Sequence, residues 1–392
     1  MLRIAVIFEG TPFDRKGVFN AVHDRVRHLA SAGDCQADVY CVHSWDTPFT
    51  RRIRKTPMIS GKVPELEIDG IIYRMLWYDF SIADHLLVEK LHRRPFFFRR
   101  FMKGITGLFE GYDVISAHSF TGGLIAREVH EKTGIPYQVT WHGSDIHTHP
   151  WRNPLKLKHT QSVMKDASCN FFVSEALMAC SERISTSARK EVLYNGVSER
   201  FRRFPDEERS RLRTLYGVGK EDKVVAFVGS IVAVKNVFRL QPLFHEIRRL
   251  FGGELKFWMV GDGKLRGEVE PMLMSDETID VRFWGNIPPD DVPSVMNCID
   301  VMVLPSLNEG LPLVCAEAIR CGASVVGSDA GGIAEVIGKD NVVPLDDAFV
   351  PAMAAKVVSM LETPACQTVP DMMDWDRTAE KEYMSLKSCL SE

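Results

Sequence analysis

Short apolar runs alternate with longer amphipathic stretches from one end of this chain to the other. The short runs hold four to eight apolar residues, which is typical of buried strands, and the longer stretches repeat their apolar positions as helices do. This alternation predicts parallel sheets covered by helices, the doubly wound α/β class. Loops at the carboxyl ends of the strands are then expected to carry the chemistry.

The apolar runs form two sets, separated by an Asn-Gly turn at Gly196 and the polar stretch 204–208. We therefore predict a first domain over residues 1–196 and a second over residues 197–372. The expected strands of the first domain are Ile4–Phe8, Ala37–Val42, Ile71–Leu76, Val114–Ala117, Tyr137–Thr140, Asn170–Val173 and Glu191–Tyr194. Those of the second are Val224–Val228, Lys256–Val260, Val281–Trp284, Val301–Leu304 and Ser324–Val326.

The stretch from Ser306 to Glu317 reads as a loop and a helix after the strand Val301–Leu304, with Glu309 and Glu317 eight positions apart. Carboxylates accept hydrogen bonds from paired sugar or ribose hydroxyls, and a helix start attracts phosphate, so the pattern favours a sugar nucleotide. The alternative is a helix-capping box formed by Ser306 and Glu309. It would place Pro312 inside the helix, where proline removes a hydrogen bond.

Polar residues follow other predicted strands as well. His142, ahead of Gly143 and Asp145, suits a donor to a sugar hydroxyl or phosphate oxygen, although a lone histidine is commonly structural. Lys235 opens the next helix after Val224–Val228, and it either binds a diphosphate or is a solvated surface lysine. The run from Gly261 to Gly267 is one residue too long for a dinucleotide fingerprint, so it predicts a tight strand-to-helix turn.

Two basic segments suggest an anionic partner. The first predicted strand is followed by a loop that contains Arg15, Lys16 and Gly17. This loop could bring an acceptor or a phosphate close to the backbone, and the alternative is an ordinary surface loop without a ligand. Residues 90–103 interleave six Lys and Arg with four Phe, which fits either an anionic lipid surface or a helix whose Phe side chains enter the core. The nearby basic run 51–55 favours the lipid. The residues expected to contact it are Arg93, Arg94, Phe96, Phe97, Phe98, Arg99 and Arg100.

Composition narrows the class of protein. With 45% hydrophobic and 26% charged residues the chain is typical of globular proteins, and no apolar run approaches the ~20 residues of a membrane span. Nine cysteines without a C-x-x-C pair predict reduced thiols and therefore the cytoplasm, with a peripheral place on the inner membrane face under the lipid hypothesis. His147 and His149 alternate without a Cys or carboxylate cluster, so no metal is expected.

The net charge of −4 hides a difference between the two halves. Residues 1–196 carry 26 Lys and Arg against 21 Asp and Glu, whereas the remainder carries 22 against 31. A basic first half suits contact with an anionic surface or acceptor. Nucleic acid is not expected as a partner, because neither basic run belongs to a recognisable nucleic-acid-binding module.

Taken together, these motifs resemble the retaining glycosyltransferases of family 4, and the resemblance covers essentially the whole chain. The matching motifs are Glu309 to Glu317 as the Glu-x7-Glu signature, Val260–Gly263, Trp284–Ile287, Asp329–Glu335, His142–Asp145 and Asn195–Val197. The resemblance implies the GT-B fold, two Rossmann-like domains facing a cleft. It also implies that a C-terminal tail, residues 373–392 from about Trp375, crosses back to the first domain.

The resemblance further implies roles for individual residues. Glu309 and the amides of Gly310 and Leu311 would hold the donor sugar, Glu317 the ribose hydroxyls, and Lys235 the diphosphate. Catalysis is expected from His142, Glu309 and Lys235. The donor site would be completed by Gly229, Ser230, Gly261 and Ile287, and the acceptor or phosphate side by Arg15, Lys16, Gly17 and Asp145.

One departure concerns Ser230, which stands where the family often has an arginine. A guanidinium binds phosphate more strongly than a hydroxyl, so either Lys235 and helix N-termini suffice or Arg15 or Lys16 helps.

The implied activity is retaining transfer, without metal or cofactor, from a nucleotide sugar, UDP-sugar in preference to GDP-sugar, to a glycan or lipid-linked acceptor. Cell-surface polysaccharide biosynthesis is the expected process. The alternatives are a sugar-nucleotide isomerase of the same fold and a sugar-nucleotide-binding protein without turnover.

Overall fold

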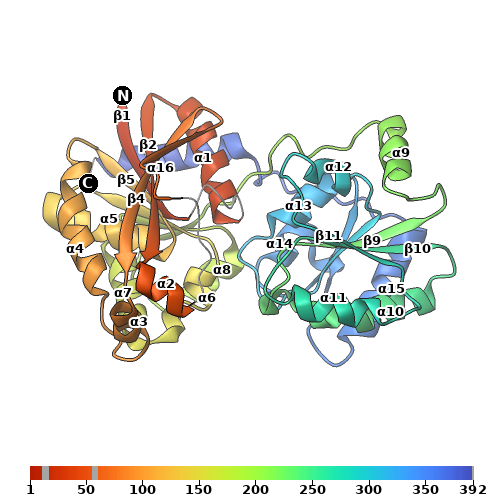
Figure 1. Ribbon diagram of the computed structural model, residues 1–392. Helices are drawn as coiled ribbons and strands as arrows, with labels where there is room; N and C mark the ends of the chain where they lie inside the picture. Colours follow the sequence, from red (N-terminus) through yellow and green to blue (C-terminus); the bar gives the residue numbers. More distant parts are fainter. Residues whose placement is uncertain (11–16, 55–60, 391–392) are drawn as a thin grey trace. The chain divides into compact units, whose positions relative to one another are not determined.

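The computed structural model describes residues 1–10, 17–54 and 61–390. Two units share the chain (Figure 1): the N-terminal unit comprises Met1–Gly196 with Asp374–Glu392, and the C-terminal unit comprises Val197–Met373. Each unit is built on one mainly parallel sheet with helices packed on it, so the predicted GT-B-like α/β class is confirmed.

The sheet of the N-terminal unit has the strand order β3-β4-β2-β1-β5-β6-β7-β8. All neighbours are parallel except β3 and β4, which form an antiparallel pair. The strands are β1 Leu2–Glu9, β2 Cys35–Asp46, β3 Glu65–Ile68, β4 Ile71–Phe80, β5 Val114–His118, β6 Tyr137–Trp141, β7 Cys169–Phe172 and β8 Lys190–Val192.

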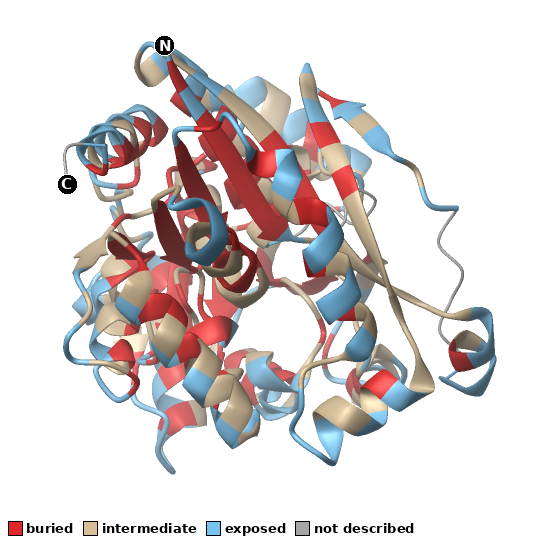
Figure 2. Ribbon diagram, turned by 90° about the vertical axis from the view of Figure 1, so that its left-hand side faces the viewer, coloured by how far each residue is buried: buried red, intermediate tan, exposed pale blue. Residues whose placement is uncertain are grey.

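Helices shield this sheet from solvent, and Figure 2 shows the central strands buried among them. The helices are α1 Val18–Ala32, α2 Pro48–Arg54, α3 Ile82–Glu89, α4 Phe96–Ile105, α5 Ser119–Thr133, α6 Ser144–His147, α7 Pro154–Asp166, α8 Glu175–Ser181 and α16 Trp375–Ser388, with 3-10 turns η1 Thr106–Phe109 and η2 Pro150–Arg152. The first strand is buried from Ile4 to Phe8 because both faces of a central parallel strand are covered.

The last helix, α16, packs against α1 and so returns to the N-terminal unit, as predicted for the tail. Its Tyr383 ring lies on Gly33, where a Cβ atom would be 2.3 Å from the ring, and Trp375 covers Gly196 in the same way. Glu382, also on α16, accepts a hydrogen bond of 2.7 Å from the Ser116 hydroxyl of β5. Small residues and a buried polar contact therefore seat α16 on the unit.

The sheet of the C-terminal unit has the order β11-β10-β9-β12-β13-β14 and is parallel throughout. Its strands are β9 Lys223–Val228, β10 Leu255–Val260, β11 Val281–Gly285, β12 Val301–Leu304, β13 Ser324–Ser328 and β14 Val342–Val343. Its helices are α9 Asp206–Leu215, α10 Leu240–Leu250, α11 Arg266–Met274, α12 Val292–Met296, α13 Leu313–Arg320, α14 Ile333–Ile337 and α15 Phe349–Glu362, with 3-10 turns η3 Ala233–Lys235, η4 Val237–Arg239 and η5 Lys339–Asn341.

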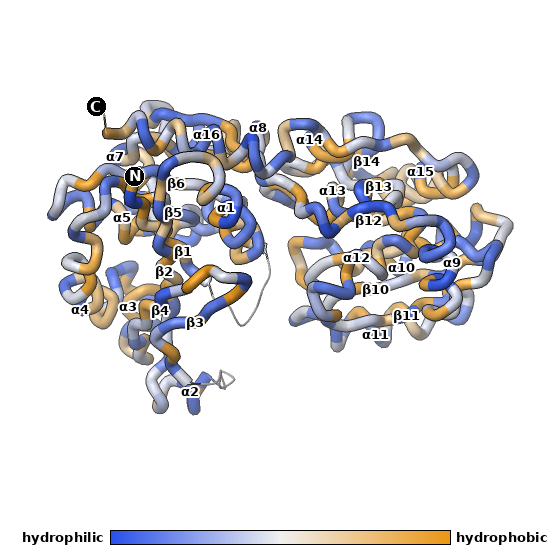
Figure 3. The backbone as a smooth tube through the Cα atoms, turned by 90° about the horizontal axis from the view of Figure 1, so that it is seen from above, coloured by the Kyte–Doolittle hydropathy of each residue, from blue (hydrophilic) through white to orange (hydrophobic). Residues whose placement is uncertain are grey.

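Hydropathy separates core helices from surface helices in this unit. Helix α15 is largely hydrophobic and packs on α10 and the central strands, whereas α9 is hydrophilic along most of its length (Figure 3).

Each sheet has a switch point, which is a pair of neighbouring strands from which the chain continues toward opposite ends of the sheet. It lies between β1 and β5 in the N-terminal unit and between β9 and β12 in the C-terminal unit. Ligands of open α/β sheets bind outside the carboxyl ends of the strands at this point. The loops after these four strands are therefore the places to look for a site.

The predicted strands are all present, with differences at their ends and edges. Strands β2 and β4 run four residues beyond the predicted ends, to Asp46 and Phe80, and remain paired there. Two short edge strands, β3 and β14, were not predicted. No helix in the described part of the chain combines the length and hydrophobicity that crossing a bilayer requires. All nine cysteines are free thiols.

Candidate functional site

In the C-terminal unit, the loops that follow β9 and β12 meet at the switch point. The Leu307 amide donates to the Val234 carbonyl at 2.8 Å and ties the two loops together. Beside this contact, Lys235 Nζ lies 2.5 Å from Glu309 Oε1, and both side chains are largely buried, with 19% and 12% exposed. Two residues predicted from separate motifs are thus brought into one ion pair.

Ser306 holds the same carboxylate from the opposite end of its loop. This serine is fully buried, and its hydroxyl donates to Glu309 Oε1 at 2.6 Å. The helix that follows, α13, begins only at Leu313, one residue after Pro312. The capping box is therefore absent, because Ser306 lies too far ahead of the helix to cap it. Pro312 itself precedes the first helical residue, where its missing amide is harmless.

The structure corrects the setting of Lys235. The prediction placed this lysine at the start of a helix, but it ends the 3-10 turn η3, and α10 begins only at Leu240. Asn236, the next residue, has a left-handed backbone with φ of 54°, which redirects the chain after Lys235. A short turn, and not a long helix, therefore presents the ammonium group to Glu309.

Glycine at position 331 lets a third loop pass beneath Glu309. A Cβ atom at Gly331 would lie 2.0 Å from the Glu309 carbonyl oxygen, and its φ of 57° is in the left-handed region. The next amide, of Gly332, donates to that carbonyl at 3.3 Å. The loop after β13 thus supports the backbone that carries the carboxylate.

The glycines after β9 and β10 serve close packing between loops. A Cβ at Gly261 would lie 2.1 Å from the Gly229 carbonyl oxygen, and one at Gly263 would lie 2.3 Å from the carbonyl oxygen of Ile231. The Gly261 amide also donates to Gly285 at 2.9 Å. The close packing at these glycines supports the prediction of a tight turn after β10. It also places the loops that carry Ser230 and Ile287, both half-buried, along one edge of the sheet.

Glu317 is half-buried on α13, near the same group of charges. Burial raises the pKa of the Cys315 thiol, the carboxylates of Glu309 and Glu317 raise it further, and Lys235 opposes them. All three charged side chains therefore act on this one buried thiol. Gly310 is buried and Leu311 half-buried between the two glutamates.

In the N-terminal unit, His142 follows β6 and is held by its own loop. Its backbone amide donates to Asp145 Oδ2 at 3.0 Å, and the Gly143 amide donates to Oδ1 at 2.8 Å. The Ser119 hydroxyl binds the same carboxylate, which is only 5% exposed. Asp145 was predicted on the acceptor or phosphate side, but its oxygens are used to shape the His142 loop.

The His142 ring lies against a second histidine at the switch point. Its Nε2 is 3.2 Å from Nδ1 of His118, the last residue of β5. Burial, and to a smaller extent the nearby Arg25 guanidinium, lower the pKa of His142 to about 3. The pKa of His118 is well below its usual value for the same reasons. Both rings are therefore neutral at physiological pH.

Comparisons with known proteins match both units. The family model described as "Glycosyl transferase 4-like domain" matches residues 16–196, and the one described as "Glycosyl transferases group 1" matches residues 222–363. The chain belongs to the GT-B glycosyltransferases of family 4. Its enzymatic class is thus a glycosyltransferase.

Individual relatives agree with this assignment. The chain is 25% identical to the Bacillus subtilis (strain 168) protein TuaC, assigned as a teichuronic acid biosynthesis glycosyltransferase, over 86% of this chain and 83% of TuaC. It is 27% identical to the Escherichia coli UDP-Gal:alpha-D-GlcNAc-diphosphoundecaprenol alpha-1,3-galactosyltransferase, over 59% of this chain and 62% of that enzyme. The crystal structure of Anabaena HepE with UDP and glucose superimposes with a TM-score of 0.66 at 15% identity, over 97% of this chain and 95% of that one.

Some predicted site residues of this glycosyltransferase fall elsewhere. Arg15 and Lys16 lie outside the described residues, and Gly17, which is described, immediately precedes α1 with open space around it. Of the residues expected on a lipid surface, Arg94 is used internally, because it pairs with Glu128 and donates to His159. Phe98 is buried, since it packs against Tyr78 of β4. Those two residues are corrections to the predicted surface.

The other side of α4 is exposed. Phe96 is 63% exposed, and the basic side chains that accompany it on the surface are Arg93, Arg99, Arg100 and Lys103. Phe97 is half-buried. One face of this helix therefore enters the core, as the second hypothesis expected, whereas the other face keeps the mixed basic and aromatic character on which the lipid prediction rests.

Several polar residues at the N-terminal switch point were missed by the sequence analysis. Besides His118 and Ser119, these are Glu9, which accepts a 2.5 Å hydrogen bond from Thr121, and Lys156, whose charge acts on Glu9. Part of the signal was present in the sequence, since Glu9 and His118 each directly follow a predicted strand, Ile4–Phe8 and Val114–Ala117.

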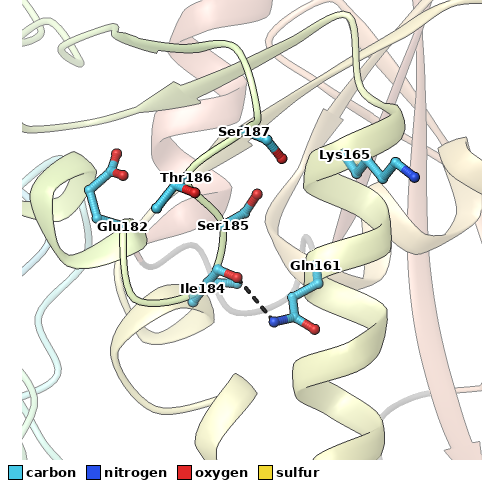
Figure 4. A pocket seen from close by; sticks show the side chains of 7 residues that line it. All are labelled: Gln161, Lys165, Glu182, Ile184, Ser185, Thr186 and Ser187. Atoms are coloured by element: carbon cyan, nitrogen blue, oxygen red, sulfur yellow. Dashed lines mark hydrogen bonds between the residues drawn. The ribbon is translucent and has the colours of Figure 1, made fainter.

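The pocket in Figure 4 lies away from these loops. It has a volume of about 350 Å³ and is lined by Gln161, Lys165, Glu182, Ile184, Ser185, Thr186 and Ser187. Its segments lead into the amino ends of β7 and β8, the opposite edge of the sheet from His142. We therefore do not assign it to the transfer reaction. Among residues 1–10, 17–54 and 61–390, no three His, Cys, Asp or Glu side chains gather as they would around a metal ion.

Proposed function

We propose that this glycosyltransferase moves a sugar from a nucleotide sugar to a glycan or lipid-linked acceptor, with retention of anomeric configuration and without a metal ion. The observation that carries the proposal is the Lys235–Glu309 pair at the switch point of the C-terminal sheet. A cation suited to phosphate and a carboxylate suited to sugar hydroxyls lie side by side there, as a sugar nucleotide requires.

The donor roles follow from this geometry. The ammonium group of Lys235 has three hydrogens, so it can stay paired with Glu309 while donating to a diphosphate oxygen. The second oxygen of Glu309, together with the amides of Gly310 and Leu311, is proposed to bind the sugar. Glu317, one helix turn into α13, is proposed to accept from the ribose hydroxyls, and the loop at Ile287 to lie beside the base.

The chemistry follows from the charges that develop. As the bond between the anomeric carbon and the phosphate oxygen breaks, its electron pair stays on the diphosphate, where Lys235 and the amides at the start of α13 stabilise it. The acceptor hydroxyl bonds to the anomeric carbon on the same face and gives its proton to the leaving phosphate. Because positively charged protein groups neutralise the leaving group, the proposed reaction needs no metal ion.

Relatives and neighbours suggest the substrates. HepE was crystallised with UDP and glucose, which supports a UDP-sugar donor in preference to a GDP-sugar. TuaC is assigned to teichuronic acid biosynthesis, and the galactosyltransferase acts on a sugar linked to diphosphoundecaprenol. We therefore propose an acceptor in cell-surface polysaccharide biosynthesis, reached at the cytoplasmic face of the membrane. The exposed basic and aromatic face of α4 suits docking on anionic lipid there.

Donor binding and turnover test the proposal. A panel of nucleotide sugars is screened for thermal stabilisation, and release of nucleotide diphosphate is then measured with membrane extract as the acceptor source. We expect Lys235→Ala and Glu309→Gln to reduce release at least ~100-fold, because each removes a charged contact in a desolvated site. Lys256→Ala is the matched control, since it breaks an ion pair with Asp280 at the amino edge of the same sheet.

The outcomes separate the alternatives. Full release by folded Lys235→Ala and Glu309→Gln variants would refute the site assignment. An epimerised sugar nucleotide formed from donor alone would indicate an isomerase. Tight donor binding without transfer to any component of the extract would indicate a binding protein without turnover.

A further inference from the structure

The loops after β5 and β6 are cross-linked twice beside His142. The first link is the contact of 3.2 Å between His118 Nδ1 and His142 Nε2, with the ring centroids 5.4 Å apart. The second is the hydrogen bond from the Ser119 hydroxyl to Asp145, the carboxylate that also binds the His142 and Gly143 amides. The last residue of β5, His118, and the first residue of α5, Ser119, thus hold both the ring and the backbone of His142.

The backbone conformation of Ser119 indicates that the surrounding structure forces this residue into its place beside Asp145. Its φ is +61°, a left-handed conformation that residues other than glycine adopt only where the surroundings require it. The strained residue is the first residue of α5 and directly follows the last residue of the buried strand β5. It turns the hydroxyl toward Asp145 while His118 keeps its place at the end of β5. Strain of this kind clusters at functional sites.

The unpaired nitrogen of His118 decides which ring donates. His118 is 1% exposed, and its Nε2 has no hydrogen-bond partner among the residues that the structure describes. If His142 donated to His118 Nδ1, the neutral His118 ring would carry its hydrogen on Nε2, as a buried N–H without an acceptor. Such orphaned N–H groups are rarer and costlier than an unused lone pair. His118 therefore donates from Nδ1, and His142 Nε2 accepts.

We infer that His118 is a positioning residue that fixes His142 in the tautomer with its hydrogen on Nδ1. A neutral imidazole has one donor and one acceptor, so once Nε2 accepts from His118 the hydrogen must be on Nδ1. His142 then presents a hydrogen-bond donor to its ligand and no basic lone pair. The donor property is intrinsic to the N-terminal unit, whereas its use toward a sugar or phosphate oxygen rests on the proposed function.

The surrounding charges support a neutral donor. Arg25 is buried near both rings, donates to Thr140 and Asn195, and lies 3.6 Å from Glu382. Burial and, second to it, the positive charge of Arg25 lower the pKa of both histidines, so neither ring takes up a second hydrogen that would remove the tautomer preference. Helix α16, through Glu382, thus helps to set the environment of the histidine pair.

Nitrogen-15 NMR of the full-length protein labelled at histidine tests the inference without any ligand, because ring nitrogens with and without hydrogen have distinct shifts. We expect His142 to carry its hydrogen on Nδ1 at pH 7.5, with the signal assigned by its loss in His142→Gln. In His118→Leu the preference for Nδ1 should disappear. In His118→Asn it should persist, because the Asn amide nitrogen occupies the place of Nδ1 and can donate to His142 Nε2.

A matched control lies on the next helix. His130 of α5 contacts the Ile135 carbonyl through Nδ1 at 3.0 Å, so His130→Leu also removes a histidine hydrogen bond and should leave the His142 signal unchanged. A hydrogen on His142 Nε2 in the parent protein would overturn the inference. An unchanged His142 tautomer in His118→Leu would overturn it too.

Turnover provides a second readout. Release of nucleotide diphosphate should fall about tenfold in His118→Leu and stay within about twofold of the parent in His118→Asn and His130→Leu. Equal losses in the Leu and Asn variants would assign His118 a merely structural role and overturn the inference. If the tautomer results hold but the parent releases no nucleotide from any donor, the proposed function fails while the histidine arrangement stands.

Discussion

Glu309 depends on a single buried hydroxyl as well as on Lys235. Ser306 is fully buried and donates at 2.6 Å to the oxygen that also pairs with the lysine. Hydrogen bonds to charged groups contribute ~1.5–3 kcal/mol, and in Ser306→Ala the ion pair remains while the carboxylate gains freedom to rotate. We expect donor turnover, measured as kcat/KM for nucleotide release, to fall roughly tenfold or more.

Ser275→Ala is the control, because it removes an exposed serine hydroxyl that donates to Met272 at 2.8 Å. That variant should keep parental turnover. Parental turnover in Ser306→Ala as well would show that Lys235 alone orients the carboxylate.

Single residues show where sequence reasoning succeeds. Glu309 and Lys235 could be predicted because each lies just beyond an apolar strand, and parallel strands end at a common edge. The sequence indicated that Ser306 pairs with Glu309. It did not indicate what the pairing does, because a serine three residues before a glutamate also matches a capping box. His118 could be placed at the end of a strand, but its contact with His142 could not be predicted, because that contact depends on which strands become neighbours and spacing along the chain does not give that order.

At the scale of one element, α4 carries a prediction about lipid. Its exposed cations Arg99 and Arg100, together with Arg93 just before the helix, flank the exposed ring of Phe96, and each cation near an anionic membrane contributes ~1 kcal/mol. Reversing all three to Glu should weaken binding of the full chain to vesicles containing anionic phosphatidylglycerol at least ~100-fold in a sedimentation assay.

Control variants separate this surface from net charge. Arg27, Arg202 and Arg211 are exposed on other elements, and reversing them changes the net charge by the same amount. Their reversal should weaken vesicle binding by much less. An equal loss of vesicle binding in both triple variants would show that net charge alone explains the effect. Parental vesicle binding by the α4 variant would exclude this face as the docking surface.

Helices and strands differ in how clearly the sequence predicts them. Continuously apolar strands such as β12 and the middle of β1 are predictable because a central parallel strand is buried on both faces. The edge strand β3 alternates charged and apolar residues over only four positions, and β14 has two residues, so neither gives a periodic signal. Helix α4 was ambiguous for a physical reason, since one face packs on Tyr78 while the other remains solvated.

For the whole molecule, the histidines predict that the two units respond differently to pH. Eleven of the 12 histidines lie in the N-terminal unit, and the C-terminal unit has only His245, which is exposed. Burial lowers the pKa of His142 and His149 to about 3 and that of His159 to about 4, and His118 is also well below its usual value. These side chains stay neutral in the folded unit at pH 5.5.

The direction in which pH changes the stability of the N-terminal unit follows from proton uptake on unfolding. An unfolded histidine has a pKa of about 6.5, so as the pH falls below that value the unfolded chain takes up protons that the folded unit does not. Stability is therefore lost as the pH falls, and about 1 kcal/mol is lost per buried neutral histidine between pH 7.5 and 5.5. The carboxyl of Asp145, whose pKa is raised by burial, acts in the opposite direction and moderates the loss.

Hydrogen exchange read peptide by peptide in the full chain measures each unit separately. The slowest amides of β5 and β6 should report an unfolding free energy lower by roughly 2–4 kcal/mol at pH 5.5 than at pH 7.5, after correction for intrinsic exchange, whereas those of β9 and β12 should change by less than about 0.5 kcal/mol. His118→Leu should reduce the pH dependence of the N-terminal unit by about one proton. Equal pH dependence in both units would contradict the assignment of neutral buried histidines, because those with a lowered pKa all lie in the N-terminal unit.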